Sequence, residues 1–151
     1  EADTADFGRA LGGCLKSGDS VFLEGDLGAG KSVLARGAAR ALGIDRPMPS
    51  PTFTLMQPYA GRVNVRHFDL YRLTDEDEFI ASGLDEYLGG DGVSFVEWPL
   101  PGLTAPGPAL RVTIERTDAQ EERRITVDDT DFAGRSEEIH RALAPWKGAN
   151  A

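Results

Sequence analysis

The chain has 151 residues, of which 40% are hydrophobic and 27% are charged. This length and composition predict one globular domain, residues 1–151, with a core large enough to need no disulfides. Its 16 Lys and Arg against 25 Asp and Glu give a formal net charge of −9. Because a chain that binds nucleic acid alone needs a basic surface to displace phosphate counterions, we expect little direct binding of nucleic acid.

Three further features predict a cytoplasmic protein. No run approaches the 18 apolar residues of a membrane span, so no association with a membrane is expected. No charged and then apolar leader opens the chain. The single cysteine, Cys14, cannot form an internal disulfide and is expected in a helix core, which favours a reducing compartment.

Hydrophobic spacing and turn residues divide the chain into helices and strands. In chain order, the expected elements are a helix over 3–16, a strand over 21–23, a helix over 31–42 that stops at Gly43, strands over 53–55 and 62–70 with a turn near Ala60-Gly61, a helix beginning at 75–78, a strand over 93–97, a hairpin of strands over 110–115 and 124–127, and a helix over 136–143.

A glycine-rich loop directly follows the first expected strand. Residues 25–32 match the pattern G-x-x-x-x-G-K-[S/T] at each fixed position. Glycines allow backbone N–H groups to approach phosphate oxygens, and the start of the next helix adds positive potential. Lys31 then supplies charge to the β- and γ-phosphates, and Ser32 offers a hydroxyl to Mg²⁺. The expected nucleotide-binding residues are Asp26, Leu27, Gly28, Ala29, Gly30, Lys31 and Ser32.

The same loop indicates the fold class and the nucleotide. A strand, a phosphate loop, a helix and later strand–strand segments predict a P-loop NTPase-like three-layer α/β/α fold with a mixed, partly antiparallel sheet. The Asn/Thr-Lys-x-Asp motif that reads guanine is absent from the sequence. ATP or ADP with Mg²⁺ is therefore the expected ligand.

Two carboxylates follow apolar strand patterns. Asp69 ends one such run, where it is either an exposed strand-end residue or an orienter or base for a water molecule near Mg²⁺. Glu97 ends the most hydrophobic strand, and ligands of open α/β sheets gather at the carboxyl ends of strands. His67 and His140 lack acidic or cysteine partners at metal-ligand spacing, which favours structural or surface roles.

Four segments, in this order, resemble the bacterial TsaE family, the ATPase of tRNA threonylcarbamoyladenosine biosynthesis. They are Gly25-Asp26-Leu27-Gly28-Ala29-Gly30-Lys31, Ser50-Pro51-Thr52-Phe53-Thr54-Leu55, His67-Phe68-Asp69-Leu70-Tyr71-Arg72-Leu73 and Val96-Glu97-Trp98-Pro99. The resemblance extends from about residue 5 to residue 100. Ser32 stands where the family usually has Thr, and both residues present a hydroxyl.

The resemblance implies further site residues. It makes residues 50–55 a switch-like loop with Thr52 as the polar contact. It favours Asp69 as an orienter or base for a water molecule, and it makes Glu97 a direct or indirect Mg²⁺ ligand. Thr4 lies near the family's N-terminal nucleotide contact. Lys31, Asp69 and Thr52 are thus the expected catalytic residues, with Ser32 and Glu97 at the metal.

The family also implies partners and a function. The chain would hydrolyse ATP slowly alone and faster with the TsaB and TsaD proteins, supporting modification of the adenosine beside the anticodon while binding little tRNA directly. Two alternatives stay open. One is a P-loop small-molecule kinase, although no Arg-rich lid is evident in the sequence, and the other is a nucleotide-dependent assembly module.

Several other side chains have two interpretations each. Arg36, Arg66 and Arg72 are candidates to stabilise charge on the transferring phosphoryl group, and Arg36 is equally suited to a salt bridge on its helix. Trp98 either packs on the 50–55 loop or is a core aromatic residue.

Overall fold

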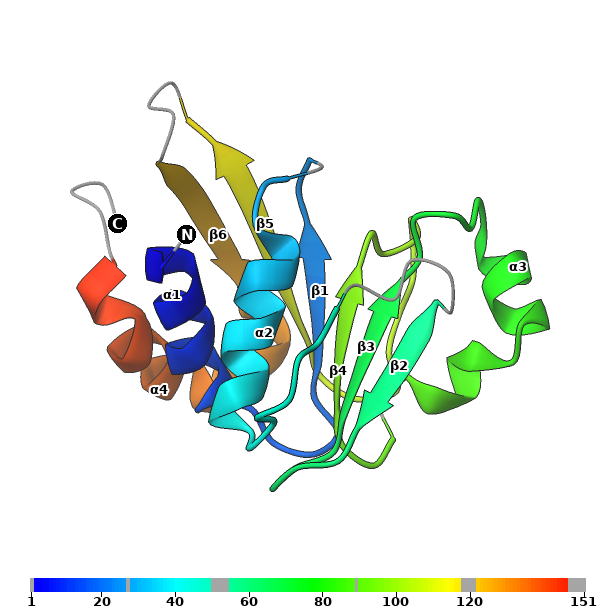
Figure 1. Ribbon diagram of the computed structural model, residues 1–151, viewed down its shortest axis with the longest axis horizontal. Helices are drawn as coiled ribbons and strands as arrows, with labels where there is room; N and C mark the ends of the chain where they lie inside the picture. Colours follow the sequence, from blue (N-terminus) through cyan, green and yellow to red (C-terminus); the bar gives the residue numbers. More distant parts are fainter. Residues whose placement is uncertain (1, 27, 50–54, 89, 118–121, 147–151) are drawn as a thin grey trace.

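The computed structural model describes residues 2–26, 28–49, 55–88, 90–117 and 122–146, which form a mixed six-stranded sheet. The strands are β1 (Ser20–Glu24), β2 (Met56–Tyr59), β3 (Val65–Asp69), β4 (Val93–Glu97), β5 (Ala109–Arg116) and β6 (Arg123–Asp128). Their order across the sheet is β2-β3-β4-β1-β5-β6 (Figure 1). The four central strands are parallel, and each edge strand is antiparallel to its neighbour. The expected mixed sheet is confirmed.

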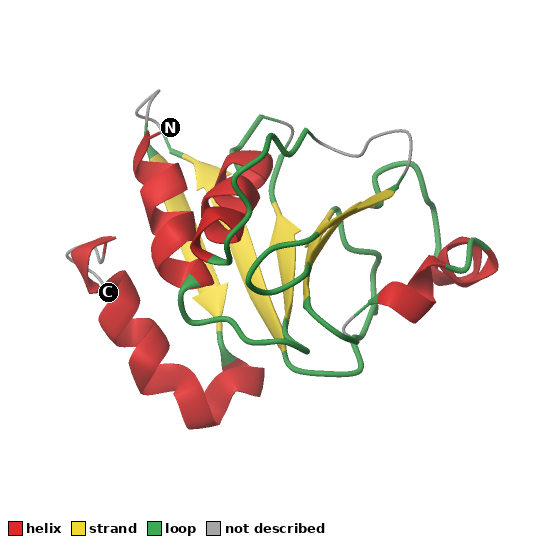
Figure 2. Cartoon of the chain, turned by 60° about the horizontal axis from the view of Figure 1, so that its bottom comes forward, coloured by secondary structure: helices red, strands yellow, loops and turns green. Residues whose placement is uncertain are grey.

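Three helices cover one face of the sheet, and α3 packs with loop residues against the other. Helices α1 (Ala2–Gly12), α2 (Lys31–Ala41) and α4 (Ser136–Leu143) lie on one face, and α3 (Glu76–Ala81) stands apart near β2 (Figures 1 and 2). Short 3₁₀ turns complete the chain: η1 (Leu84–Tyr87), η2 (Thr130–Arg135) and η3 (Ala144–Trp146).

Successive residues of β1 explain why two layers flank the sheet. Val21 and Leu23 belong to the core shared with α1, α2 and α4, whereas Phe22 belongs to a second core with Phe79 of α3. Side chains alternate between the faces of a strand, so a wholly apolar strand must be covered on both sides. This arrangement is the three-layer α/β/α fold.

Glycines bring α1 close to α2, the helix that begins at the phosphate loop. A Cβ atom on Gly8 would lie 2.2 Å from the carbonyl oxygen of Leu34, and one on Gly37 would lie 2.2 Å from that of Ala5. Both distances are shorter than any real carbon–oxygen contact, so a larger residue at either position would push the helices apart. The backbone packing of α1 against α2 therefore sets the position of the loop's helix.

Most expected elements are present, with one correction. The first helix ends at Gly12 rather than at residue 16. Of the strand expected over 53–55, Phe53 and Thr54 lie outside the described residues, and Leu55 is a bend directly before strand β2 at Met56–Tyr59. Pro58 makes that segment read as a loop, but β2 is an edge strand, where a residue without an N–H group is tolerated.

The described helices are short. α1 and α2 have 11 residues each. Within the described ranges, no helix combines the length and apolarity that crossing a membrane would require.

Candidate nucleotide-binding site

The phosphate loop runs from the end of β1 to the start of α2 and adopts a backbone that glycine permits. Gly28 and Gly30 have φ angles of 76° and 119°, in the left-handed region. A Cβ atom on Gly25 would lie 2.5 Å from the carbonyl oxygen of Ile114 on β5. Glycine is thus required for conformation at two positions and for close strand packing at a third. Leu27 lies outside the described residues.

Lys31, the first residue of α2, is folded back over this loop. Its ammonium group donates to the carbonyl oxygens of Gly25 and, at 3.3 Å, of Asp26. The Nζ atom also lies 3.5 Å from the centroid of the Trp98 ring. Burial lowers the pKa of the Lys31 ammonium, whereas the carboxylates of Glu97, Asp69 and Asp26 raise it. A partly desolvated cation held by neutral carbonyl groups is suited to accept an incoming anion.

Trp98 covers the lysine from the end of β4. Its side chain is half-buried, its φ angle is 55°, and its ring centroid lies 4.9 Å from that of Tyr71. The ring therefore contacts a residue of the site, and the interpretation of Trp98 as a plain core aromatic is wrong. The expected packing of Trp98 on the 50–55 loop involves residues 50–54, which lie outside the described residues.

Ser32 and Glu97 meet although 65 positions separate them. The Ser32 hydroxyl lies 3.0 and 2.9 Å from the two carboxylate oxygens of Glu97, which is buried at the end of β4. The structure thus places the hydroxyl expected at the metal beside the acid expected there.

His67 contacts the same carboxylate from β3. Its Nε2 lies 2.5 Å from Glu97 Oε2, and its side chain is fully buried. Its Nδ1 has no hydrogen-bond partner among the described residues. His67 is therefore not a surface residue, and it has an acidic partner that its sequence neighbours do not indicate. The available signal was its spacing of two from Asp69, which puts both on one face of a strand.

Asp69 lies next to Glu97 at the carboxyl ends of two parallel strands. The two residues are register partners in the β3–β4 pair. Asp69 is buried, and its Oδ1 accepts the backbone N–H of Tyr71 at 3.0 Å. The structure therefore brings Asp69, Glu97, Ser32 and Lys31 together at one edge of the sheet.

The donor set fits Mg²⁺. A hydroxyl and carboxylates are the hard oxygen ligands that this ion takes in nucleotide sites, where phosphates and water complete the octahedron. Among the described residues, no group of three or more His, Cys, Asp and Glu side chains forms a cage for a metal ion. Such a sparse set suits an ion that arrives with a nucleotide.

Of the two expected threonines, Thr4 belongs to the described residues and Thr52 does not. Thr4 is buried near the start of α1, and its methyl carbon would lie 3.5 Å from a Cβ atom on Gly30. The first turn of α1 thus adjoins the end of the phosphate loop. Thr52, the expected contact of the switch-like loop, lies outside the described residues.

Two arginines that sequence reasoning missed contact the phosphate loop from the β5–β6 hairpin. Arg123 Nε donates to the carbonyl oxygen of Ala29 at 3.0 Å. Arg116 Nη2 lies 2.5 Å from the place where Gly28 would carry a Cβ atom. No local motif marks these residues, because their proximity depends on β5 pairing with β1.

Arg36 and Arg66, two of the arginines that the sequence analysis named, contact backbone carbonyl groups. Arg36 donates to the carbonyl oxygen of Met48 at 3.4 Å, and Arg66 donates to that of Tyr87 at 3.1 Å. Within the described residues, no carboxylate forms a salt bridge with Arg36. The interpretation of Arg36 as part of a helix-surface salt bridge is therefore wrong.

A glycine-rich loop between a central parallel strand and its helix, with acids at the ends of neighbouring strands, defines a P-loop NTPase fold. Comparisons with known proteins agree. The family model described as "Threonylcarbamoyl adenosine biosynthesis protein TsaE" matches residues 1–125.

Individual relatives support the same assignment. A TsaE protein of Bacillus subtilis is 46% identical over 113 residues, which are 74% of this chain and 70% of that protein. A TsaE protein of Treponema pallidum is 40% identical over 126 residues, 83% of this chain and 93% of that protein. The crystal structure of Bacillus subtilis YdiB superposes with a TM-score of 0.73 at 33% identity, covering 97% of this chain and 90% of that chain. The chain belongs to the TsaE family.

Proposed function

We propose that this chain is the ATP-hydrolysing subunit of a threonylcarbamoyladenosine-forming system that acts on tRNA. Membership of the TsaE family assigns it to that biosynthesis, and the P-loop NTPase fold implies nucleotide binding. The observation that carries the ATPase proposal is the contact of Ser32 with Glu97, with Lys31 and Asp69 beside them. That set contains a cation for phosphate, a hydroxyl with a carboxylate for Mg²⁺, and a second carboxylate for water.

Each residue has a separate task in this proposal. Lys31 leaves the loop carbonyls and binds the β- and γ-phosphates. Ser32 and Glu97 would hold Mg²⁺, which would neutralise charge that develops on the phosphate oxygens. Asp69 orients the attacking water or accepts its proton. Thr52 contributes from the 50–55 loop, as the family resemblance implies.

We further propose that TsaB and TsaD raise a slow basal rate. The hydrolysis of a phosphoanhydride needs charge stabilisation and a closed, dry site, and a cation supplied by a partner can contribute about 10³–10⁵-fold. The net charge of −9 supports a protein that joins a complex and leaves tRNA binding to others.

The test is an ATPase assay of the chain alone and with purified TsaB and TsaD at matched Mg²⁺. We expect a low basal rate that the partners raise. Thr52→Ala should reduce the stimulated rate more than the basal rate, and Thr104→Ala, at an exposed position, is the control.

Other outcomes would select other functions. A high basal rate that the partners do not change would contradict the proposal. Phosphate transfer to a small acceptor would favour a kinase, and nucleotide-dependent binding of the partners without turnover would favour an assembly module.

A further inference from the structure

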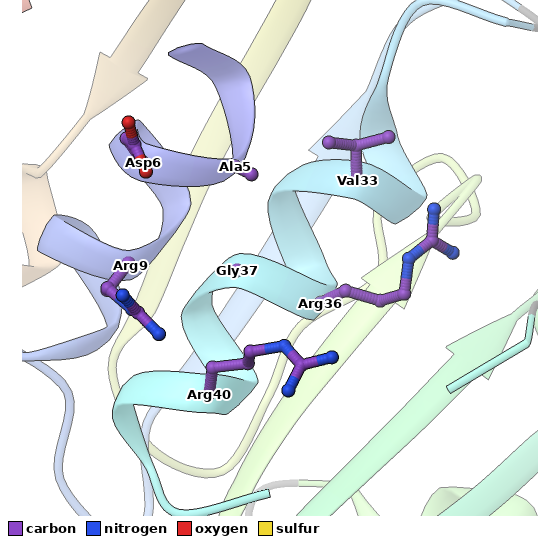
Figure 3. Close-up of a pocket in the computed structure, with 7 residues that line it drawn as sticks. All are labelled: Ala5, Asp6, Arg9, Val33, Arg36, Gly37 and Arg40. Carbon is purple, nitrogen blue, oxygen red and sulfur yellow. The ribbon is translucent and has the colours of Figure 1, made fainter. Parts of the chain in front are cut away.

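A second candidate site lies in the groove between α1 and α2, away from the phosphate loop. A pocket of about 460 Å³ is lined by Ala5, Asp6, Arg9, Val33, Arg36, Gly37 and Arg40. Figure 3 shows Arg9 rising from α1, and Arg36 and Arg40 from α2. The α-helical rise places Arg36 and Arg40 roughly 6 and 12 Å along the axis from Ser32. The arginines therefore extend the pocket away from the phosphate-binding end of α2.

The three guanidinium groups lack anionic partners in the part of the chain that the structure describes. None of the salt bridges found there involves Arg9, Arg36 or Arg40. Arg36 and Arg40 donate only to the carbonyl oxygens of Met48 and Asp45, at 3.4 and 3.3 Å. Asp6 contributes one carboxylate to the lining, so three cations face one anion there and the pocket keeps an excess of positive charge. Such a concentration is unusual in a chain with nine more acids than bases.

We propose that this pocket, the α1–α2 arginine pocket, binds a carboxylate-bearing segment of a protein partner. The planar guanidinium group matches a carboxylate through two parallel hydrogen bonds. The pocket also has apolar surface from Ala5 and Val33, which suits a peptide segment better than a free inorganic anion. The inference rests on the proposed function, in which this chain acts together with protein partners.

Charge around the pocket disfavours the backbone of a nucleic acid as the occupant. Asp3 and Asp6 are exposed on the first two turns of α1. A phosphate chain long enough to bind tightly would pass both carboxylates and be repelled, whereas one or two acidic side chains approach only Asp6, which lines the pocket itself. Binding here would also touch α2, the helix that begins with Lys31 and Ser32.

The test compares Arg9→Gln/Arg40→Gln with Arg124→Gln/Arg141→Gln, a control that removes two exposed arginines elsewhere. The probe is a short fluorescein-labelled peptide of alternating glutamate and alanine, followed by anisotropy at low and at raised salt. Loss of charge-assisted hydrogen bonds should weaken peptide binding about tenfold or more in the pocket variant. The control variant should bind like the wild type, and circular dichroism should show both folded.

Parallel titrations distinguish the alternatives. The inference would be overturned if the peptide did not bind the wild type, or if both double variants bound the peptide equally weakly. A parallel fall in the ATP affinity of the pocket variant would also overturn it, because the pocket would then be part of the nucleotide site. The same holds if the pocket variant lost binding to a tRNA transcript but kept binding to the peptide. If TsaB and TsaD fail to bind the wild type while the peptide result holds, the proposed partners are wrong and the pocket assignment stands.

Discussion

His67 offers the most informative perturbation of the site, because its effects on stability and on metal binding separate. His67→Phe removes a hydrogen bond to the buried carboxylate of Glu97, which costs about 1.5–3 kcal/mol. It also removes a buried ring nitrogen, Nδ1, that has no partner among the described residues, which returns about 1–3 kcal/mol. Since a phenyl ring resembles the imidazole in shape, we expect the free energy of unfolding to change by no more than about 2 kcal/mol.

The effect on the metal should be larger. With His67 gone, the Ser32 hydroxyl is the remaining hydrogen-bond partner among the described residues that orients the Glu97 carboxylate. Loss of such a supporting contact typically lowers metal affinity about 10–100-fold. We expect His67→Phe to shift the Mg²⁺ titration of ADP binding by that factor, measured by calorimetry. His67→Gln, whose amide can still donate to the carboxylate, should recover part of the loss.

Two controls make the result decisive. Urea unfolding of each variant establishes that the site is folded, and His140→Gln changes an exposed histidine outside the site. A folded His67→Phe protein with the Mg²⁺ dependence of the wild type would refute the view that His67 positions Glu97. A loss of equal size in His67→Gln would show that ring packing, and not the hydrogen bond, matters.

Two further predictions concern the loop lysine and the core. Lys31→Ala should abolish measurable ATP binding by calorimetry with little change in the fold, because it removes the charge at the phosphates; wild-type affinity would contradict the assignment. Arg135→Met should lower the free energy of unfolding by about 3 kcal/mol in urea, because it leaves the buried Asp19 carboxylate without its two guanidinium hydrogen bonds. Arg141→Met breaks only an exposed ion pair with Glu137 and should change unfolding by less than about 0.5 kcal/mol; equal losses in the two variants would rule out burial as the cause.

The phosphate loop and the fold class were readable from local patterns. Glycine spacing, Lys31 and Ser32 act within eight consecutive residues, so their chemistry depends little on distant parts of the chain. The order of helices and strands followed from apolar periodicity for the same reason. The exception was β2, because Pro58 argues against a strand unless that strand lies at the edge of the sheet, as β2 does.

The partners within the site were decided by tertiary structure. His67 and Glu97 lie 30 positions apart, and they meet because β3 pairs with β4 in a register that no local pattern encodes. The same holds for Arg116 and Arg123, which reach the phosphate loop only because β5 pairs with β1.

The arginine pocket depends on a third contact, the glycine-mediated packing of α1 on α2. From the sequence, Arg9 and Arg40 are ordinary helix-surface cations that solvent would screen. Backbone approach between the two helices places them around one pocket with Arg36. The sequence thus determined which chemical groups this protein has for binding phosphate, and strand register and helix packing decided which of those groups act together, because both are set by contacts between residues far apart in the chain.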